Sequence, residues 1–375
     1  MCNTKIYQKA KEFYERGDLI KSLYYFLEEI KIKTENIDSY YYLALIYKKK
    51  NKIEKYYYNL AYYYYLDKKY HNSIFNFKRC LKINPKDNNT LYHLALSYSA
   101  LKRFSEAKYC FKKIAKINLD YSNLYYNIGN TYSSCNNYEK AIIYYKKALK
   151  LENRDDAYYN IALCYHHLGK INLAIKYYKK SIEINTLKCE AYFNLSKCYM
   201  DKKDYNNSII FLKKNLKIEP NNEDAHYNLG VSFFTLEKFD LAIKKFEKVL
   251  RTNLNDKYVY LYLGMSYSKL GEYKLAIDIF QKGLTIDNKF VDFTYNIGII
   301  YFNIREYELA VLNFRKAIEI QDYYKIHFHL GITYYYMNDY KLALNELILF
   351  QKSQPNDLEV LKYIRACNKK LNIIS

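Results

Sequence analysis

Pro and Gly, the residues typical of tight turns, are scarce in this 375-residue chain, and Trp is missing. The chain has 3 Pro, 9 Gly and no Trp. A chain of this length carries about 19 Pro and about 26 Gly on average. Because tight turns depend on Gly and Pro, their scarcity disfavours an all-β sandwich or barrel. It also excludes collagen-like chains and Pro/Gly-rich low-complexity chains.

Long apolar segments are also missing. No stretch is long and apolar enough for a transmembrane helix, and the first residues lack the apolar core of a secretory signal. The 8 cysteines form no CxxC pair and no zinc-finger spacing with His, which is typical of free thiols in a reducing compartment. We therefore expect a cytoplasmic protein with no membrane span.

What is abundant indicates a folded chain with more than one core. Half of the residues are apolar and 18% are aromatic, and 60 Lys and Arg against 39 Asp and Glu leave a net charge of +21. Such a composition does not belong to a disordered chain. Since one core rarely grows past about 250–300 residues, the chain is either several domains or a repeat array.

An internal repeat decides between these alternatives. Small residues, called anchor residues below, recur with a period of about 34 residues, in two places one residue shorter and once at half that spacing. The anchor residues are Ala10, Ala44, Ala61, Ala95, Gly129, Ala162, Ser196, Gly230, Gly264, Gly298 and Gly331. Tyr or Phe follows each of them after three residues, and all three prolines stand at one and the same distance after an anchor residue. Apolar residues within a repeat recur at spacings of three or four, which predicts helices.

This pattern resembles the tetratricopeptide repeat, W-x2-L-G-x2-Y…A-x3-F…P, over about residues 3–357. Its one departure is that Tyr replaces the Trp, as at Tyr40, Tyr57, Tyr125, Tyr158, Tyr192 and Tyr260. The resemblance implies an all-α fold, a right-handed superhelical solenoid of stacked antiparallel helix pairs whose core is continuous along the array.

The repeat pattern also predicts the domain organisation. We expect a first repeat at residues 1–36, a half repeat or divergent helix at 37–52, nine further repeats at 54–357 and a capping helix at 358–375, all in one continuous solenoid. Two interpretations of the half repeat stay open, a local packing irregularity and a divergent full repeat.

No catalytic, metal or cofactor motif is present. The sequence has no GxGxxG, GxxxxGK[ST], GxSxG or HExxH pattern. The seven His do not converge at metal-ligand spacing. We therefore expect a protein that is not an enzyme and needs no cofactor or metal.

The most informative column lies two residues before the anchor residue, where Asn predominates. Its members of interest are Asn127, Asn160, Asn194, Asn228 and Asn296. The resemblance places this column on the first helix of each pair, facing the concave groove, as in the asparagine ladder of the O-linked N-acetylglucosamine transferase, where such residues hold the main chain of an extended polypeptide. An amide side chain can pair with both the N–H and the C=O of a peptide unit. The alternative is that Asn is simply common in this column.

An aromatic column precedes the asparagines by one residue. It includes Tyr126, Tyr159, Phe193 and Tyr227. These rings could stack on ligand side chains or form only a half-buried groove wall.

Charge is divided between the two helices of a repeat. Several first helices begin with an acid, at Asp156, Glu190, Asp224 and Asp292, which also suits a helix N-terminus. The second helices carry basic doublets such as Lys146–Lys147 and Lys179–Lys180. We expect a solvated outer face with at most weak, non-specific binding of polyanions.

These observations predict a non-enzymatic protein–protein interaction scaffold or adaptor whose groove binds an extended polypeptide segment. Two alternatives remain, the specificity subunit of an enzyme complex and a basic RNA-binding helical-repeat protein. The second is disfavoured because the basic doublets and the aromatic groove column are expected on different faces.

Overall fold

A computed structural model of the protein describes residues 4–32, 36–115 and 122–371. In these ranges it holds twenty-two α-helices and no β-strand, so the predicted all-α class is confirmed. The chain divides into two compact units, residues 1–186 and 187–375.

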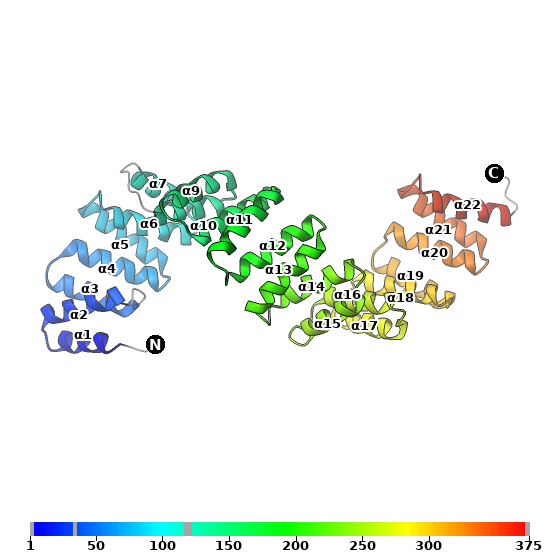
Figure 1. The fold of residues 1–375 in the computed structure, drawn as a ribbon, viewed down its shortest axis with the longest axis horizontal. Helices are drawn as coiled ribbons and strands as arrows, with labels where there is room; N and C mark the ends of the chain where they lie inside the picture. Colours follow the sequence, from blue (N-terminus) through cyan, green and yellow to red (C-terminus); the bar gives the residue numbers. More distant parts are fainter. Residues whose placement is uncertain (1–3, 33–35, 116–121, 372–375) are drawn as a thin grey trace. The chain divides into compact units, whose positions relative to one another are not determined.

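Each unit contains eleven helices (Figure 1). Those of the first unit are α1 (Lys5–Glu15), α2 (Leu19–Ile32), α3 (Ile37–Lys49), α4 (Ile53–Leu66), α5 (Tyr70–Ile83), α6 (Asn88–Ala100), α7 (Phe104–Ala115), α8 (Ser122–Ser133), α9 (Tyr138–Leu151), α10 (Asp155–His167) and α11 (Ile171–Ile184). Those of the second unit are α12 (Cys189–Asp201), α13 (Tyr205–Ile218), α14 (Glu223–Thr235), α15 (Phe239–Leu250), α16 (Lys257–Lys269), α17 (Tyr273–Ile286), α18 (Val291–Asn303), α19 (Tyr307–Ile320), α20 (Tyr324–Tyr336), α21 (Tyr340–Ser353) and α22 (Leu358–Lys370).

Consecutive helices pack as antiparallel pairs joined by short loops (Figure 1). In the first unit α8 pairs with α9 and α10 with α11, and in the second the pairs run from α12/α13 to α20/α21. Each pair also contacts the next pair of its unit. The predicted stack of helix pairs is therefore confirmed within each unit, while the handedness of the superhelix stays a prediction.

Helix α3 interrupts the alternation of first and second helices. It lies within the residues of the expected half repeat, and the chain runs from it directly into α4. Helix α4 packs against both α3 and α5. The anchor residues Ala44 of α3 and Ala61 of α4 are both fully buried, so α4 serves as the partner of α3 and as the first helix of the following pair.

The anchor residues lie where two helices approach most closely. In the first unit Ala61, Ala95 and Ala162 are fully buried, and the ring sixteen residues after each is also buried, at Phe77, Phe111 and Tyr178. In the second unit a Cβ atom added to Gly264 would lie 2.4 Å from Cε1 of Phe280. The column is therefore restricted to small residues because the aromatic ring of the second helix occupies the space beside it.

The turn between the two helices of a repeat has one residue in the left-handed conformation, seven residues after each anchor residue. Its amide and the next one bond back to the helix, as for Lys203 N to Met200 O (2.7 Å) and Asp204 N to Tyr199 O (2.8 Å). Only three of these residues are glycines, at Gly17, Gly169 and Gly271, and eight others carry a side chain at positive φ. The scarcity of Gly therefore does not reflect a lack of left-handed turns, since the helix ends hold Lys, Asn, Glu and Arg in that conformation.

The contact between an anchor residue and the ring of the second helix can be tested at Gly264 and Phe280. Gly264→Ser should destabilise the protein by about 1–3 kcal/mol, because the new atoms overpack the site. The variant Gly264→Ser/Phe280→Leu copies the fully buried pair Ser196 and Leu212. We expect it to lose less stability than the sum of the two single variants in urea unfolding, by about 1 kcal/mol. Additive losses would show that the two positions do not share one space.

Candidate functional site

All nine residues proposed as a ligand-binding site lie on first helices and are partly buried. Helix α8 carries Tyr126 and Asn127, α10 carries Tyr159 and Asn160, α12 carries Phe193 and Asn194, α14 carries Tyr227 and Asn228, and α18 carries Asn296. The first two helices belong to the first unit and the others to the second. One ladder running through both units therefore stays a prediction.

In the first unit the asparagine and aromatic columns are hydrogen-bonded to each other from one repeat to the next. The Nδ2 of Asn127 donates to the Oη of Tyr92 at 2.5 Å. The Nδ2 of Asn160 donates to the Oη of Tyr126 at 3.0 Å. Each asparagine is thus held by the tyrosine of the preceding first helix, a contact that neither column reveals on its own.

Asn160 belongs to a larger network. Its Nδ2 also lies 3.2 Å from the Oδ1 of Asn130, which accepts a bond from the Oη of Tyr145 at 2.8 Å. Burial raises the pKa of Tyr126, and the nearby charge of Asp156 adds to this effect, so its hydroxyl stays neutral. Asn130 is a functional neighbour that the sequence reasoning missed, because it stands outside both columns.

The second unit repeats this contact once with a different residue type. The Oη of Tyr295 lies 3.1 Å from the Nδ1 of His329, which occupies the asparagine column. Asn296 follows a repeat with Leu261 in the aromatic column, which has no hydroxyl. Its Nδ2 instead donates to the backbone oxygen of Asp292 at 2.7 Å.

Asn228 differs from the other asparagines in its surroundings. The aromatic column of the preceding repeat holds Phe193, which cannot hydrogen-bond. Among the described residues, no hydrogen bond of the Asn228 side chain is found, and the side chain is only partly buried. Beside it, the ring of Tyr227 packs against Phe246 and Tyr262, with both centroid distances 6.1 Å. The amide of Asn228 is therefore available to a ligand next to a packed aromatic wall.

The rings of Tyr159 and Phe193 have contacts of other kinds. Tyr159 packs on Tyr178, with centroids 5.7 Å apart. The Nζ of Lys197 lies 5.9 Å from the centroid of the Phe193 ring. Both rings are thus half-buried on the surfaces of their first helices.

His93 occupies the asparagine column on α6 and lies in an aromatic environment. The centroids of five rings lie between 4.7 and 6.3 Å from its own, those of Tyr58, Tyr62, Tyr65, Phe77 and Tyr92. Its Nδ1 is buried and has no hydrogen-bond partner. Burial lowers the pKa of His93 to about 4, so the imidazole is neutral at pH 7.

Arg154 is a second functional neighbour that sequence reasoning missed. It precedes α10, and its guanidinium carbon lies 4.3 Å from the centroid of the Tyr126 ring. Its Nε and Nη2 pair with the two carboxylate oxygens of Asp156 at 2.6 and 2.7 Å. Its Nη1 donates to the Oδ1 of Asn123 at 2.7 Å. The guanidinium group of Arg154 therefore covers the Tyr126 ring of the aromatic column.

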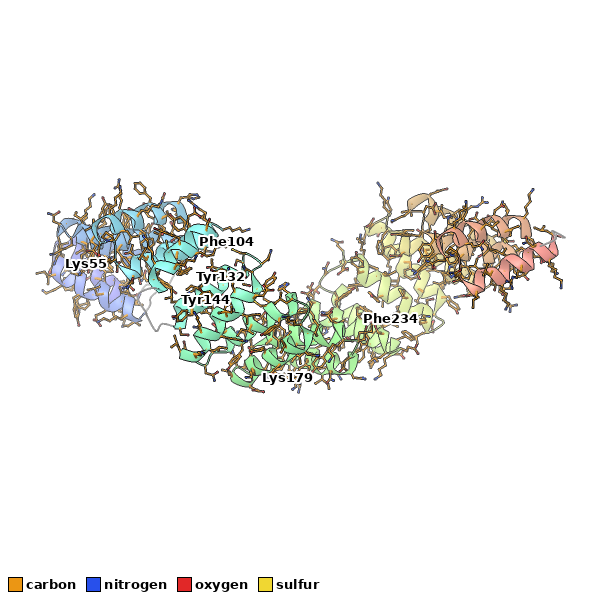
Figure 2. The ribbon with its side chains drawn as sticks, turned by 90° about the horizontal axis from the view of Figure 1, so that it is seen from above. Lys55, Phe104, Tyr132, Tyr144, Lys179 and Phe234 are labelled. Carbon is orange, nitrogen blue, oxygen red and sulfur yellow. The ribbon has the colours of Figure 1, made fainter. Side chains whose placement is uncertain are left out.

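The basic doublets of the second helices lie over tyrosines that are not in the groove columns. The Nζ of Lys147 is 5.6 Å from the centroid of the Tyr125 ring and 5.1 Å from that of Tyr144. Tyr144 in turn stacks on Tyr132, with centroids 5.4 Å apart (Figure 2). Basic side chains of the second helices are thus combined with tyrosines of both helices of a pair, a feature the sequence columns did not indicate.

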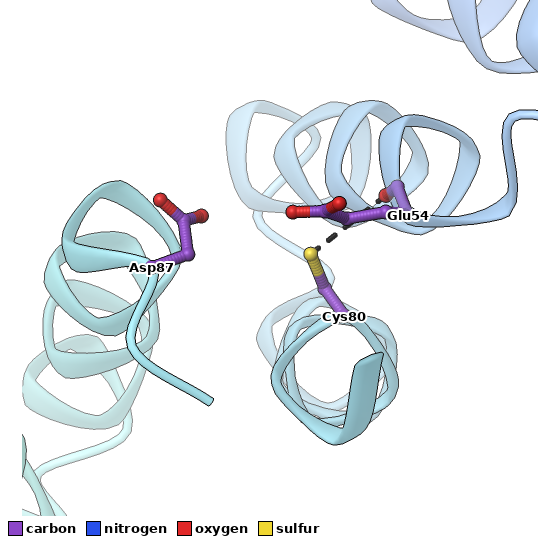
Figure 3. A group of neighbouring side chains, drawn as sticks. All are labelled: Glu54, Cys80 and Asp87. Atoms are coloured by element: carbon purple, nitrogen blue, oxygen red, sulfur yellow. Dashed lines mark hydrogen bonds between the residues drawn. The ribbon is translucent and has the colours of Figure 1, made fainter. Parts of the chain in front are cut away.

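Glu54, Cys80 and Asp87 bring one possible ligand atom each within 4.8 Å of one another (Figure 3). Burial raises the pKa of the Cys80 thiol, whose Sγ contacts the backbone oxygen of Glu54 at 3.7 Å. Asp87 caps α6 by accepting a bond from the Thr90 amide, and Glu54 accepts one from Asn84. A protonated thiol and two carboxylates already in use fit a helix junction better than a metal centre.

Comparisons with known proteins match the repeat in five segments of the chain. Family models described as tetratricopeptide repeat match residues 54–87, 89–121, 122–155, 156–185 and 291–323. A model described as anaphase-promoting complex, cyclosome, subunit 3 matches residues 201–283. A comparison with curated proteins found no match.

Solved structures with similar folds include repeat proteins of several kinds. The C-terminal part of a TPR repeat-containing protein from Cytophaga hutchinsonii is 21% identical over 64% of this chain and 99% of that one, with a TM-score of 0.54. MamA is 28% identical over 43% and 95% of the two chains, with a TM-score of 0.42. The APC/C hetero-tetramer Cut9-Hcn1 is 12% identical over 96% of each chain, with a TM-score of 0.46.

Stacked helix pairs, in each of which a small residue faces an aromatic ring or, as at Ser196 and Gly331, a leucine, define an all-α repeat protein. The chain belongs to the tetratricopeptide repeat family. In the described part of the chain, none of the helices has the length and apolar content of a membrane-spanning segment.

The bond between Asn160 and Tyr126 should contribute to stability. Asn160→Ala should lower the free energy of unfolding by about 1–2 kcal/mol, because it leaves Tyr126 and Asn130 without their shared donor. Tyr126→Phe should cost about 1 kcal/mol, and the double variant less than the sum. Asn228→Ala is the matched control and should cost under about 0.5 kcal/mol. Equal losses at Asn160 and Asn228 in urea unfolding would contradict this assignment.

His93 should make the protein less stable in acid. Its pKa is lower in the folded state, about 4, than the usual value of about 6.5 in an unfolded chain. Its contribution is therefore fully present above about pH 6.5 and is lost as the pH falls toward 4, by up to about 1.4 kcal/mol per pH unit. Unfolding of wild type and His93→Asn between pH 4.5 and 7.5 should show a smaller loss for the variant. Parallel curves would show that His93 can be protonated without cost.

Proposed function

We propose that the chain is a non-enzymatic protein-interaction scaffold whose first helices hold an extended segment of a partner protein. Membership of the tetratricopeptide repeat family supports the general role in protein interaction. The observation that carries the finer proposal is Asn228, whose amide has no hydrogen bond within the described residues and lies beside the ring of Tyr227.

The spacing of the repeats suits a main-chain ligand. Successive first helices of a stack lie about 10 Å apart, and an extended chain rises about 3.3 Å per residue. One side-chain amide would therefore meet the ligand at about every third residue. An amide offers both donor and acceptor groups to a peptide unit, so such a grip would depend little on the ligand's side chains.

Because some asparagines are hydrogen-bonded to a tyrosine, the asparagines would offer different amide groups to a ligand. The Nδ2 of Asn127 and of Asn160 is bound to a hydroxyl, which fixes the amide and leaves Oδ1 to accept a ligand N–H. Asn228 can offer both groups. An amide that is already oriented loses little entropy when the ligand binds, so we expect the held asparagines of the first unit to contribute as well as Asn228 does in the second.

A second candidate is a role within a multi-subunit assembly. It is favoured by the match of residues 201–283 to the model described as anaphase-promoting complex, cyclosome, subunit 3. This candidate shares the scaffold mechanism and differs in the identity of the partner. The specificity subunit of an enzyme complex would be one such case.

Nucleic acid is a weaker candidate, although basic groups of the second helices meet aromatic rings of both helices of a pair. Lys147 and Lys214 each lie over two such rings. A ring face covered by an ammonium group is not free to stack on a base. We therefore propose at most weak, non-specific polyanion binding there, which rising salt would abolish.

Groove binding can be tested once the native partner has been captured by affinity purification and its bound segment prepared as a peptide. Asn228→Ala should weaken the peptide about fivefold, the loss of about one net hydrogen bond. Asn296→Ala is the matched control and should change affinity less, because its amide is bound to its own helix. N-methylation of the peptide backbone should weaken binding more than alanine substitution of its side chains. Binding that survives Asn228→Ala and is lost on Lys147→Glu would overturn the proposal.

A further inference from the structure

A cavity of about 320 Å³ lies in the second unit between the starts of α18 and α20. Asp292 and Tyr295 of α18 line one side. Tyr323, Tyr324 and Lys325, at the start of α20, line the other. It adjoins the groove columns, since Tyr295 belongs to the aromatic column and Asn296 bonds to the backbone of Asp292.

The first unit contains the equivalent junction, between α8 and α10. Both junctions belong to repeats that are one residue shorter than the others, from Gly129 to Ala162 and from Gly298 to Gly331. Both have a loop of three residues before the next first helix. The backbones also agree, since the residue before the helix has φ −133° and ψ 136° at Arg154 and φ −105° and ψ 130° at Tyr323. The two sites thus differ in side chains and not in backbone path.

At the junction in the first unit a guanidinium group occupies this space. Arg154 lies over the ring of Tyr126, the counterpart of Tyr295. It also bonds to Asn123, the counterpart of Asp292, and to Asp156, the counterpart of Lys325. The Arg154 side chain is only 18% exposed, so the site is built to enclose a cation.

At the junction in the second unit Tyr323 replaces the arginine, and its side chain is 43% exposed. Asp292 is half-buried, and no ion pair of its carboxylate is found among the described residues. Burial raises the pKa of Asp292, as expected for a carboxylate without a counter-ion. The second unit therefore has the aromatic ring and the acid but lacks the internal cation.

We propose that this cavity binds the guanidinium or ammonium group of an Arg or Lys side chain from the polypeptide held along the first helices. The inference rests on the proposed function and adds a side-chain preference to it. The cation would pair with Asp292 and lie against the rings of Tyr295, Tyr323 and Tyr324, where it would gain both charge–charge and cation–π attraction.

The positive charge of Lys325 would repel a ligand cation, because Lys325 also lines the cavity. Its side chain is exposed and makes no ion pair within the part of the chain that the structure describes. An ammonium on a long, exposed stem can move into solvent when a ligand enters. Replacing Lys325 should therefore strengthen cation binding, whereas an internal Asp292–Lys325 pair would predict the reverse.

The probe for this site is N-acetyl-arginine N-methylamide, with the citrulline derivative as its uncharged match. It would be titrated against the full chain with isotope-labelled isoleucine methyl groups, because the buried Ile326 lines the cavity. We expect a saturable shift of the Ile326 signal with the arginine derivative. The citrulline derivative should bind about tenfold more weakly, since a hydrogen bond to a charged group is worth about 1.5–3 kcal/mol.

Four variants sharpen the test. Asp292→Asn should weaken the arginine probe about tenfold, and Asp224→Asn, at the exposed equivalent position on α14, should leave it unchanged. Tyr323→Arg should abolish binding, because the new side chain can occupy the cavity as Arg154 does in the first unit. Lys325→Met should strengthen binding. The comparison of arginine with citrulline on wild type needs no variant, so a folding defect cannot hide the answer.

The outcomes separate this inference from the proposed function. Equal binding of the two derivatives, or no shift of Ile326, would overturn the cation site while main-chain binding through Asn228 could still hold. Binding of the probe with no effect of Asp292→Asn on the native peptide would show that the partner does not use the cavity. Loss of both peptide and probe affinity on Asp292→Asn, with Asp224→Asn silent, is the expected result.

Discussion

The close approach of two helices at each anchor residue is the constraint on which the rest of the structure depends. Ala61, Ala95 and Ala162 are fully buried against a ring sixteen residues later, and at Gly264 even a Cβ atom would collide with Phe280. This contact sets the geometry of each helix pair. Because every pair is apolar on both sides, it is stable only when stacked on its neighbours. The other faces of the first helices are then presented at regular intervals.

Because the first helices are regularly spaced, contacts between neighbouring repeats recur at fixed sequence positions. The residue three before an anchor residue meets the residue two before the next one, as in Tyr92 with Asn127, Tyr126 with Asn160 and Tyr295 with His329. These side chains therefore contribute to the stability of the stack. After Phe193, which has no hydroxyl, Asn228 keeps its amide for other partners, whereas Asn296, which follows Leu261, bonds to its own helix. The members of one column thus differ in which of their amide groups are already hydrogen-bonded within the chain.

The regular spacing of the anchor residues predicted the helices, and the resemblance to the tetratricopeptide repeat predicted their pairing and the placing of the asparagine and aromatic columns on first helices. It did not predict the bond between Asn160 and Tyr126, because that depends on distances between neighbouring helices that no single column contains. It also did not predict the left-handed turn at Lys203, since propensity there disfavours Lys and the bonds at the helix end override it. Arg154 was missed for a similar reason, because its place over Tyr126 follows from a loop one residue shorter than usual.

The two shortened repeats show how an array can convert a structural site into a binding site. In both repeats the residue before the next first helix lies near the aromatic column, Arg154 over the ring of Tyr126 and Tyr323 lining the same cavity as Tyr295. With Arg154 in that position the space is filled, the charge of Asp156 is balanced and the junction is closed. With Tyr323 the same backbone leaves a lined cavity and an acid, Asp292, without an ion pair in the described ranges. The missing internal side chain then suggests the ligand group that would complete the site, because Tyr295 and Asp292 stand where Tyr126 and Asn123 contact a guanidinium in the first unit.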